Sequence, residues 1–206
     1  MNYSKKFGEA LQSAQIGDIT STISNINYCL SDDNKNIKQK EWCRLLLNPA
    51  NVSLISDENL MWLHKLANNN NFLAQNTLGK WYTYNEEYDE SIKYFKKCID
   101  NKKYTIGMIN LIAVYIIISE YDKAIILLKQ IIEYKDEYEY TSIKILADIY
   151  FFVDNYQFAI ELYHKYYKHF KLNKIKHSKL NNIENKIIYL GNKLNMSSYI
   201  IYELLK

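Results

Sequence analysis

Apolar and small side chains recur at helical spacing through residues 72–170, and one two-helix pattern fits this stretch three times. In each unit they occupy positions i, i+3, i+4 and i+7 on both sides of a short polar turn, which predicts two amphipathic helices joined by that turn. The turns end in Tyr88, Tyr121 and Tyr156, which are 33 and then 35 residues apart. Such a period is typical of a helical repeat array. The predicted core positions are Leu78, Tyr82, Phe95, Leu111, Ala124, Leu128, Leu146, Ala147, Ala159 and Tyr163.

Further helices are predicted on both sides of the array. Before it, helical spacing predicts helices over residues 3–15, 19–30, 37–47 and 60–67, the last two forming either a degenerate repeat or part of an N-terminal cap. After it, residues 179–194 and 197–205 are predicted to be capping helices. We therefore expect an N-terminal cap or degenerate repeat (1–56), a repeat array (57–171) and C-terminal capping helices (172–206).

The composition agrees with a helical chain. One proline and five glycines in 206 residues are few, which favours helices over a turn-rich β fold. The 20 tyrosines are strand formers by propensity, but their spacing of three and four residues is helical. Arg44 is the single arginine among 26 basic residues, leaving 25 lysines, and this bias indicates an AT-rich genome such as that of a large DNA virus or an AT-rich microbe.

Residues 66–82 and the three units resemble tetratricopeptide (TPR) repeats and the related Sel1-like repeats. The resemblance implies an all-α fold, a right-handed alpha-alpha superhelix built as a solenoid of antiparallel helix pairs. It also implies that small residues meet where paired helices cross. These small pairs are Gly79 with Ser91 and Ala147 with Ala159.

The same resemblance implies a concave groove lined by the first helix of each pair. Its apolar middle favours an apolar peptide or amphipathic helix of a partner protein, and Ile109 and Ala113 disfavour the acidic C-termini of chaperones as partners. In the alternative interpretation, the N-terminal helices or a second copy of the chain, in a homodimer, fill the groove. The predicted lining residues are Asn76, Lys80, Tyr84, Ile109, Ala113, Ile116, Ile117, Lys144, Asp148, Phe151 and Phe152, together with Leu73, Ile106 and Thr141.

A group of lysines in the C-terminal part of the chain, the basic patch, suggests an alternative function, the binding of nucleic acid or an acidic partner. Spaced lysines with aromatic residues between them suit nucleic-acid phosphates or an acidic partner. The other interpretation is a solvated helix face, because the net charge is only +3 and there is a single arginine to read bases or grip phosphates. The lysines concerned are Lys165, Lys168, Lys171, Lys174, Lys176 and Lys179.

The sequence predicts no catalytic residue, no cofactor and no metal site. It contains no glycine-rich phosphate loop, CxxC pair, HExxH motif or nucleophile elbow. His164 and His169 are five residues apart, so a helix points them in different directions. We therefore predict a non-enzymatic adaptor that acts through protein–protein interaction.

The expected compartment is the cytoplasm, or the host cytoplasm for a viral protein. The first residues lack the apolar core of a signal peptide. The most apolar stretch, residues 108–118, is shorter than the ~20 residues that span a bilayer. Three widely spaced cysteines suit a reducing compartment. We expect no membrane interaction.

Overall fold

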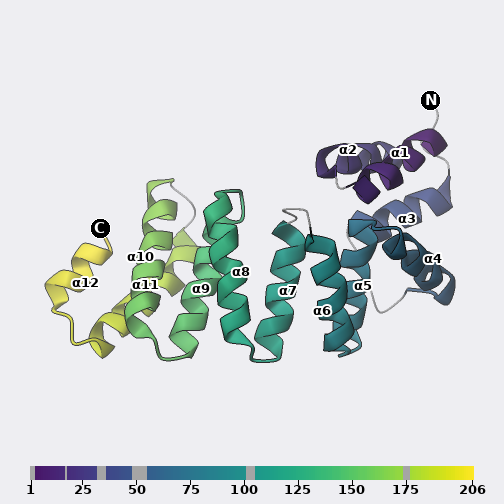
Figure 1. Cartoon of the computed structure of the whole chain (residues 1–206). Helices are drawn as coiled ribbons and strands as arrows, with labels where there is room; N and C mark the ends of the chain where they lie inside the picture. Colours follow the sequence, from purple (N-terminus) through teal and green to yellow (C-terminus); the bar gives the residue numbers. More distant parts are fainter. Residues whose placement is uncertain (1–2, 17, 32–35, 48–54, 101–104, 174–176) are drawn as a thin grey trace. The chain divides into compact units, whose positions relative to one another are not determined.

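The computed structural model describes residues 3–16, 18–31, 36–47, 55–100, 105–173 and 177–206. Every regular element within these ranges is a helix (Figure 1), so the predicted all-α fold class is confirmed. The chain divides into two compact units, Met1–Ser119 (unit 1) and Glu120–Lys206 (unit 2), which are described separately. The boundary falls in the turn of the middle repeat. The predicted divisions after residues 56 and 171 stay predictions, as does the sense of the superhelix.

Unit 1 is a series of helices in which neighbours along the chain pack together. The helix α1 packs on α2, α4 on α5, α5 on α6 and α6 on α7, while α3 contacts both α2 and α5. Antiparallel pairs joined by short turns are therefore the building block of this unit, as the spacing predicts. The helices are α1 (Tyr3–Ile16), α2 (Ile19–Leu30), α3 (Ile37–Leu47), α4 (Asp57–Asn68), α5 (Phe72–Tyr84), α6 (Tyr88–Ile99) and α7 (Thr105–Ile117).

Unit 2 repeats the same arrangement. The helix α8 packs on α9, α9 on α10 and α10 on α11, and α12 contacts α11. The capping helices predicted after the array are present as α11 and α12, each within two residues of its predicted limits. The helices are α8 (Tyr121–Tyr134), α9 (Glu139–Phe152), α10 (Tyr156–Leu172), α11 (His177–Lys193) and α12 (Ser198–Leu204).

The tight turns share one backbone geometry. The second residue after each helix has a positive φ, at Asn70 (60°), Glu86 (62°), Ser119 (61°), Asp154 (59°) and Asn195 (53°). In four of these turns the residue after the positive-φ residue donates its backbone N–H to the carbonyl of the residue five positions before it, as in a Schellman motif. None of the five positions holds glycine, the residue that adopts this conformation at least cost.

All four residues of the predicted small-residue pairs are buried. The Ser91 hydroxyl donates to the Gly79 carbonyl at 2.9 Å, across the contact between α5 and α6. Ala147 and Ala159 are both fully buried in the core of unit 2, together with Tyr163. The close approach is confirmed for Gly79 and Ser91, while for Ala147 and Ala159 the structure shows burial in the same core.

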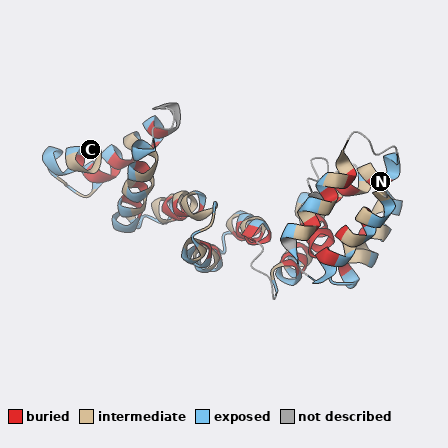
Figure 2. Ribbon diagram, turned by 90° about the horizontal axis from the view of Figure 1, so that it is seen from above, coloured by how far each residue is buried: buried red, intermediate tan, exposed pale blue. Residues whose placement is uncertain are grey.

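Each unit has its own buried core, formed where helix faces meet (Figure 2). In unit 1 the core includes a stack in which Trp42 lies 4.8 Å from Trp62 and 5.7 Å from Phe7, between ring centres. In unit 2 it is built around Tyr163 and α11. Nine of the ten predicted core residues are buried. The exception is Tyr82, which is half-buried and stacked on Tyr94 at 5.4 Å.

Candidate partner-binding surfaces

The predicted groove begins, in unit 1, with residues that are buried. Every residue from 72 to 79 of α5 is buried, including Asn76 at 4% exposure and Leu73 at 1%. Asn76 accepts a hydrogen bond from the Asn110 amide at 2.8 Å. The Thr77 hydroxyl donates to the Leu45 carbonyl of α3 at 3.2 Å, so an N-terminal helix packs on this part of α5. Asn76 and Leu73 therefore belong to the interior of unit 1 and not to an open groove.

The remaining groove residues of unit 1 form a partly exposed strip on α5 and α7. Burial lowers the pKa of the half-buried Lys80, and Tyr84 is 60% exposed. On α7, Ile109 and Ile116 are half-buried, whereas Ala113 and Ile117 are exposed. The strip is mostly apolar, as the sequence predicts.

In unit 2 the predicted residues Lys144 and Asp148 belong to a four-residue polar network. The Lys144 Nζ lies 2.8 Å from Asp148 Oδ2, and the Lys186 Nζ, from α11, lies 2.5 Å from Asp148 Oδ1. The Tyr163 hydroxyl of α10 also donates to Asp148 Oδ1, at 2.5 Å. Lys186 completes the network by donating to the Tyr163 hydroxyl at 3.0 Å. The network thus joins α9, α10 and α11.

The electrostatics keep Asp148 ionised. Burial by itself raises the pKa of its carboxyl, but hydrogen bonds from Lys144, Lys186 and Tyr163 outweigh burial and leave the pKa below the ordinary value. Burial, followed by the bond to Asp148, raises the pKa of the Tyr163 hydroxyl, which stays neutral. Two ammonium groups therefore surround one carboxylate, and the network carries a net charge of +1 at neutral pH.

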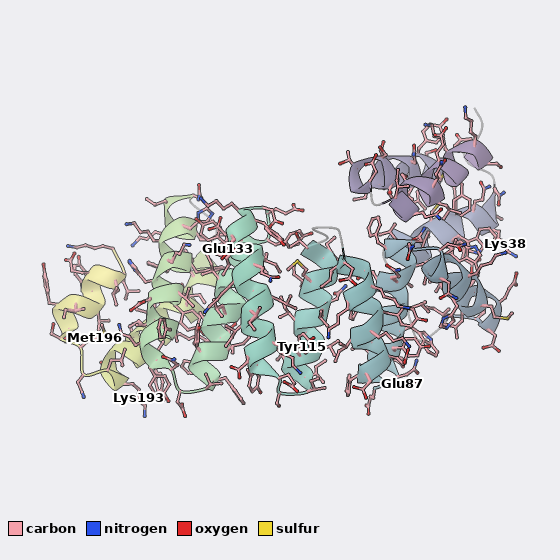
Figure 3. The ribbon with its side chains drawn as sticks, in the orientation of Figure 1. Lys38, Glu87, Tyr115, Glu133, Lys193 and Met196 are labelled. Atoms are coloured by element: carbon pink, nitrogen blue, oxygen red, sulfur yellow. The ribbon has the colours of Figure 1, made fainter. Side chains whose placement is uncertain are left out.

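A pocket of about 400 Å³ adjoins this network. Its wall includes the predicted groove residue Phe151 of α9, whose ring centre is 5.8 Å from that of Tyr189. Lys186 lies over the Phe151 ring at 5.6 Å, and Lys193, labelled in Figure 3, lies over the Tyr189 ring at 5.6 Å. The lining residues are Phe151, Asn182, Asn185, Lys186 and Tyr189.

Four of these five lining residues are missed by the sequence prediction, which interprets α11 as a cap. The spacing of these residues in the sequence nonetheless indicates that they share a surface. Asn182, Asn185, Lys186 and Tyr189 stand at i, i+3, i+4 and i+7, so they share one face of α11. A second face of the same helix carries the buried Ile183, Ile187 and Leu190. The helix therefore has both a core face and a surface that meets α9.

Apolar side chains are also exposed at the turn between α9 and α10. Phe152 is 68% exposed, Val153 43% and Phe158 53%. Their positions are fixed by ring contacts within unit 2, since Phe152 lies 5.4 Å from Tyr121 and Phe158 stacks on Tyr150 at 5.4 Å. Phe152, a predicted groove residue, is thus available to a partner at the edge of α9.

The basic patch is only partly open. The Lys165 Nζ pairs with Glu139 at 3.6 Å, and the Lys171 Nζ donates to the Leu205 carbonyl at 2.6 Å. Lys168 is exposed. Two of the three lysines whose side chains are described therefore bind groups of unit 2. Lys174 and Lys176 lie outside the described residues, as does the side chain of Lys179.

Unit 1 also contains a polar pocket, and the described residues show no metal or membrane site. The pocket has a volume of about 410 Å³. Within the ranges that the structure describes, no cluster of three or more histidine, cysteine or acidic residues is arranged to hold a metal ion. No described helix combines the length and apolarity needed to cross a bilayer. The pocket is lined by Gln15, Ala67, Asn68, Asn70, Gln75, Lys97 and Asp100.

Comparison with known proteins finds similarity in structure alone. No family model and no curated protein matches the sequence. Two solved structures, of a Podosopora anserina protein assigned as a kinesin light chain with nearly identical TPR-like repeats and of its single-residue variant, are similar to this chain. Each is 12% identical, with a TM-score of 0.49, over 98% of this chain and 90% of the other.

Proposed function

We propose that this chain is a non-enzymatic adaptor that holds a peptide or helix of a partner protein on one surface of unit 2. This surface, which we call the α9–α11 surface, consists of Phe151 and Phe152 with Asn182, Asn185, Lys186 and Tyr189. The observation that carries the proposal is the pocket of about 400 Å³ lined by Phe151 and Tyr189, beside residues already predicted to line a groove.

Rigidity of the supporting residues favours binding at this surface. Asp148 holds Lys186 from α11 and Lys144 from its own helix, and Tyr163 joins the same network from α10. A surface whose side chains are already fixed loses less conformational entropy when a partner binds. The α9–α11 surface is therefore organised before binding, unlike an exposed helix face with mobile lysines.

Exposed apolar area supports a protein partner. Phe152 and Val153, which follow the pocket residue Phe151 in the sequence, and Phe158 of α10 are large apolar side chains exposed to water. Contiguous apolar side chains on a surface mark interaction sites more often than solitary ones, and aromatic residues contribute most to binding. A peptide or helix with apolar side chains fits this surface.

The test is a comparison of two tyrosine variants by affinity capture from the cells that make the protein. Tyr189, at 45% exposure, lines the pocket, whereas Tyr199, at 71%, lies on α12 and serves as the matched control. Tyr189→Lys should lose the partners that wild type captures, while Tyr199→Lys should keep them. Identical partner sets for Tyr189→Lys and wild type, with both variants folded by circular dichroism, would reject the proposal.

A further inference from the structure

The charged side chains beside the pocket of unit 2 include two lysines, one of which lines the pocket. Lys186 lines the pocket and Lys193 lies against Tyr189, another lining residue. Asp148 is the carboxylate of the adjoining network, and its two oxygens already accept bonds from Lys144, Lys186 and Tyr163. None of the five lining residues is acidic. The lining of the pocket is therefore complementary to negative charge.

Lys186 still has a donor to offer. A lysine ammonium carries three N–H groups. Two are directed to Asp148 Oδ1 at 2.5 Å and to the Tyr163 hydroxyl at 3.0 Å. These bonds fix the position of Nζ, whose side chain is 30% exposed at the pocket wall. These two bonds leave the third N–H for a ligand oxygen at the pocket wall.

The rest of the lining suits a peptide. Asn182 and Asn185 are exposed on successive turns of α11, and a carboxamide both donates and accepts, as the peptide backbone requires. Phe151 and Tyr189 are in ring contact, with centres 5.8 Å apart and planes inclined at 55°, and together they form one apolar wall. An apolar side chain of a partner packs against this wall and not between the two rings.

From this geometry we infer that the pocket takes a partner segment carrying an acidic side chain beside an aromatic or aliphatic one. The acidic group binds Lys186, the apolar group packs against Phe151 and Tyr189, and the two asparagines bind the intervening backbone. The inference rests on the proposed function and gives the partner its chemistry. Nucleic acid also carries negative charge, but it has no aliphatic side chain to pack against the two rings. The experiment below therefore includes an oligonucleotide as a competing ligand.

The experiment begins with selection from a phage-displayed library of random 12-residue peptides against the full chain. The expected result is enrichment of peptides with Asp or Glu within three residues of Phe, Leu or Ile. Enrichment of apolar peptides without an acidic residue would overturn this inference and leave the proposed function standing. Failure of any peptide to bind in competition with a 12-nucleotide oligothymidine that does bind would overturn both.

A double-mutant cycle then tests whether the acidic residue of the peptide contacts Lys186. Lys186→Gln keeps a donor for Asp148 and Tyr163, and should weaken a selected acidic peptide about tenfold, as expected for a lost charge-assisted hydrogen bond. The same peptide with its acidic residue changed to the amide should bind Lys186→Gln and wild type equally. Lys129→Gln, an exposed lysine of α8, is the control and should change neither affinity. Equal losses for both peptides would overturn the assignment.

A second variant protects the test against misfolding. Asn185 is exposed, so Asn185→Ala should leave the fold intact. It should weaken the acidic peptide and its amide form by the same few-fold factor, because Asn185 binds backbone and not charge. A weakened acidic peptide beside an unaffected amide form would contradict the role given to Asn185, and unchanged binding of both would place the peptide elsewhere.

Discussion

Gly79 and Phe95 are in such close contact that a Cβ atom on Gly79 would lie 2.6 Å from Phe95 Cε1. The neighbouring hydroxyl of Ser91 donates to the Gly79 carbonyl, so the backbone of α5 and the side chains of α6 fit together at one point. Phe95 is 1% exposed, so other side chains of the core enclose its ring. The helix pair therefore depends on the absence of a side chain at position 79.

The first prediction compares two glycines. Gly79→Ala should destabilise the protein by about 1–3 kcal/mol, because the added methyl group overpacks the contact with Phe95. Gly8, in α1, is the matched control, since a Cβ atom added there would meet no atom within 4 Å and alanine favours a helix. Gly8→Ala should stabilise by about 0.5–1 kcal/mol. Urea unfolding measures both, and a stabilising Gly79→Ala would mean that the helices are not paired in this way.

The second prediction concerns the turn between α5 and α6. Glu86 has a φ of 62°, which costs a residue with a Cβ about 1–2 kcal/mol, while glycine adopts it freely. Glycine loses more conformational entropy on folding than glutamate, and this cost offsets part of the gain. Glu86→Gly should therefore stabilise the protein by roughly 0.5–1 kcal/mol. Lys96→Gly, at an exposed position inside α6, should destabilise by about 1 kcal/mol. A loss of stability at both positions would contradict the turn geometry.

The third prediction is a pH dependence from Asp148. The pKa of the Asp148 carboxyl is lower in the folded state than in the unfolded state. The carboxylate therefore contributes to the free energy of unfolding above the unfolded pKa of about 3.9, and this contribution disappears as the pH falls through the folded pKa. Asp148→Asn should therefore destabilise by about 1–3 kcal/mol at pH 7 and by much less near pH 2. Urea unfolding at several pH values gives the difference. An equal loss at both ends of the range would show that the carboxylate charge is not the stabilising group.

The fourth prediction tests whether the basic patch supports α12. Lys171 donates to the Leu205 carbonyl, and the His164 Nδ1 lies 2.7 Å from the Leu204 carbonyl, so α10 binds the end of α12. Lys171→Ala should raise amide hydrogen exchange in residues 198–204 several-fold. Lys168→Ala, at an exposed lysine one turn earlier, should leave exchange unchanged. Equal amide hydrogen exchange of residues 198–204 in the two variants would show that Lys171 does not stabilise α12.

Local spacing predicts which residues are buried but not which distant helices meet. Leu78, Phe95 and Tyr163 are correctly predicted as core because period and small-residue pairing act within one helix pair, between neighbours in sequence. The contact of Asp148 with Lys186 joins residues 38 apart, and no periodicity specifies it. Asn76 fails as a groove residue for a similar reason, because α3 packs on the adjoining part of α5 through a contact between Thr77 and Leu45.

Site-specific photo-crosslinking is the sharpest test of whether the α9–α11 surface holds a partner protein. A photoreactive phenylalanine analogue replaces Tyr189 in one sample and the more exposed Tyr199 in another, in the cells that make the protein. We expect a discrete crosslinked protein band from position 189 that becomes much weaker with Lys186→Gln, and no such band from position 199. A band from position 199 alone, or bands of equal strength from both positions, would contradict binding at this surface.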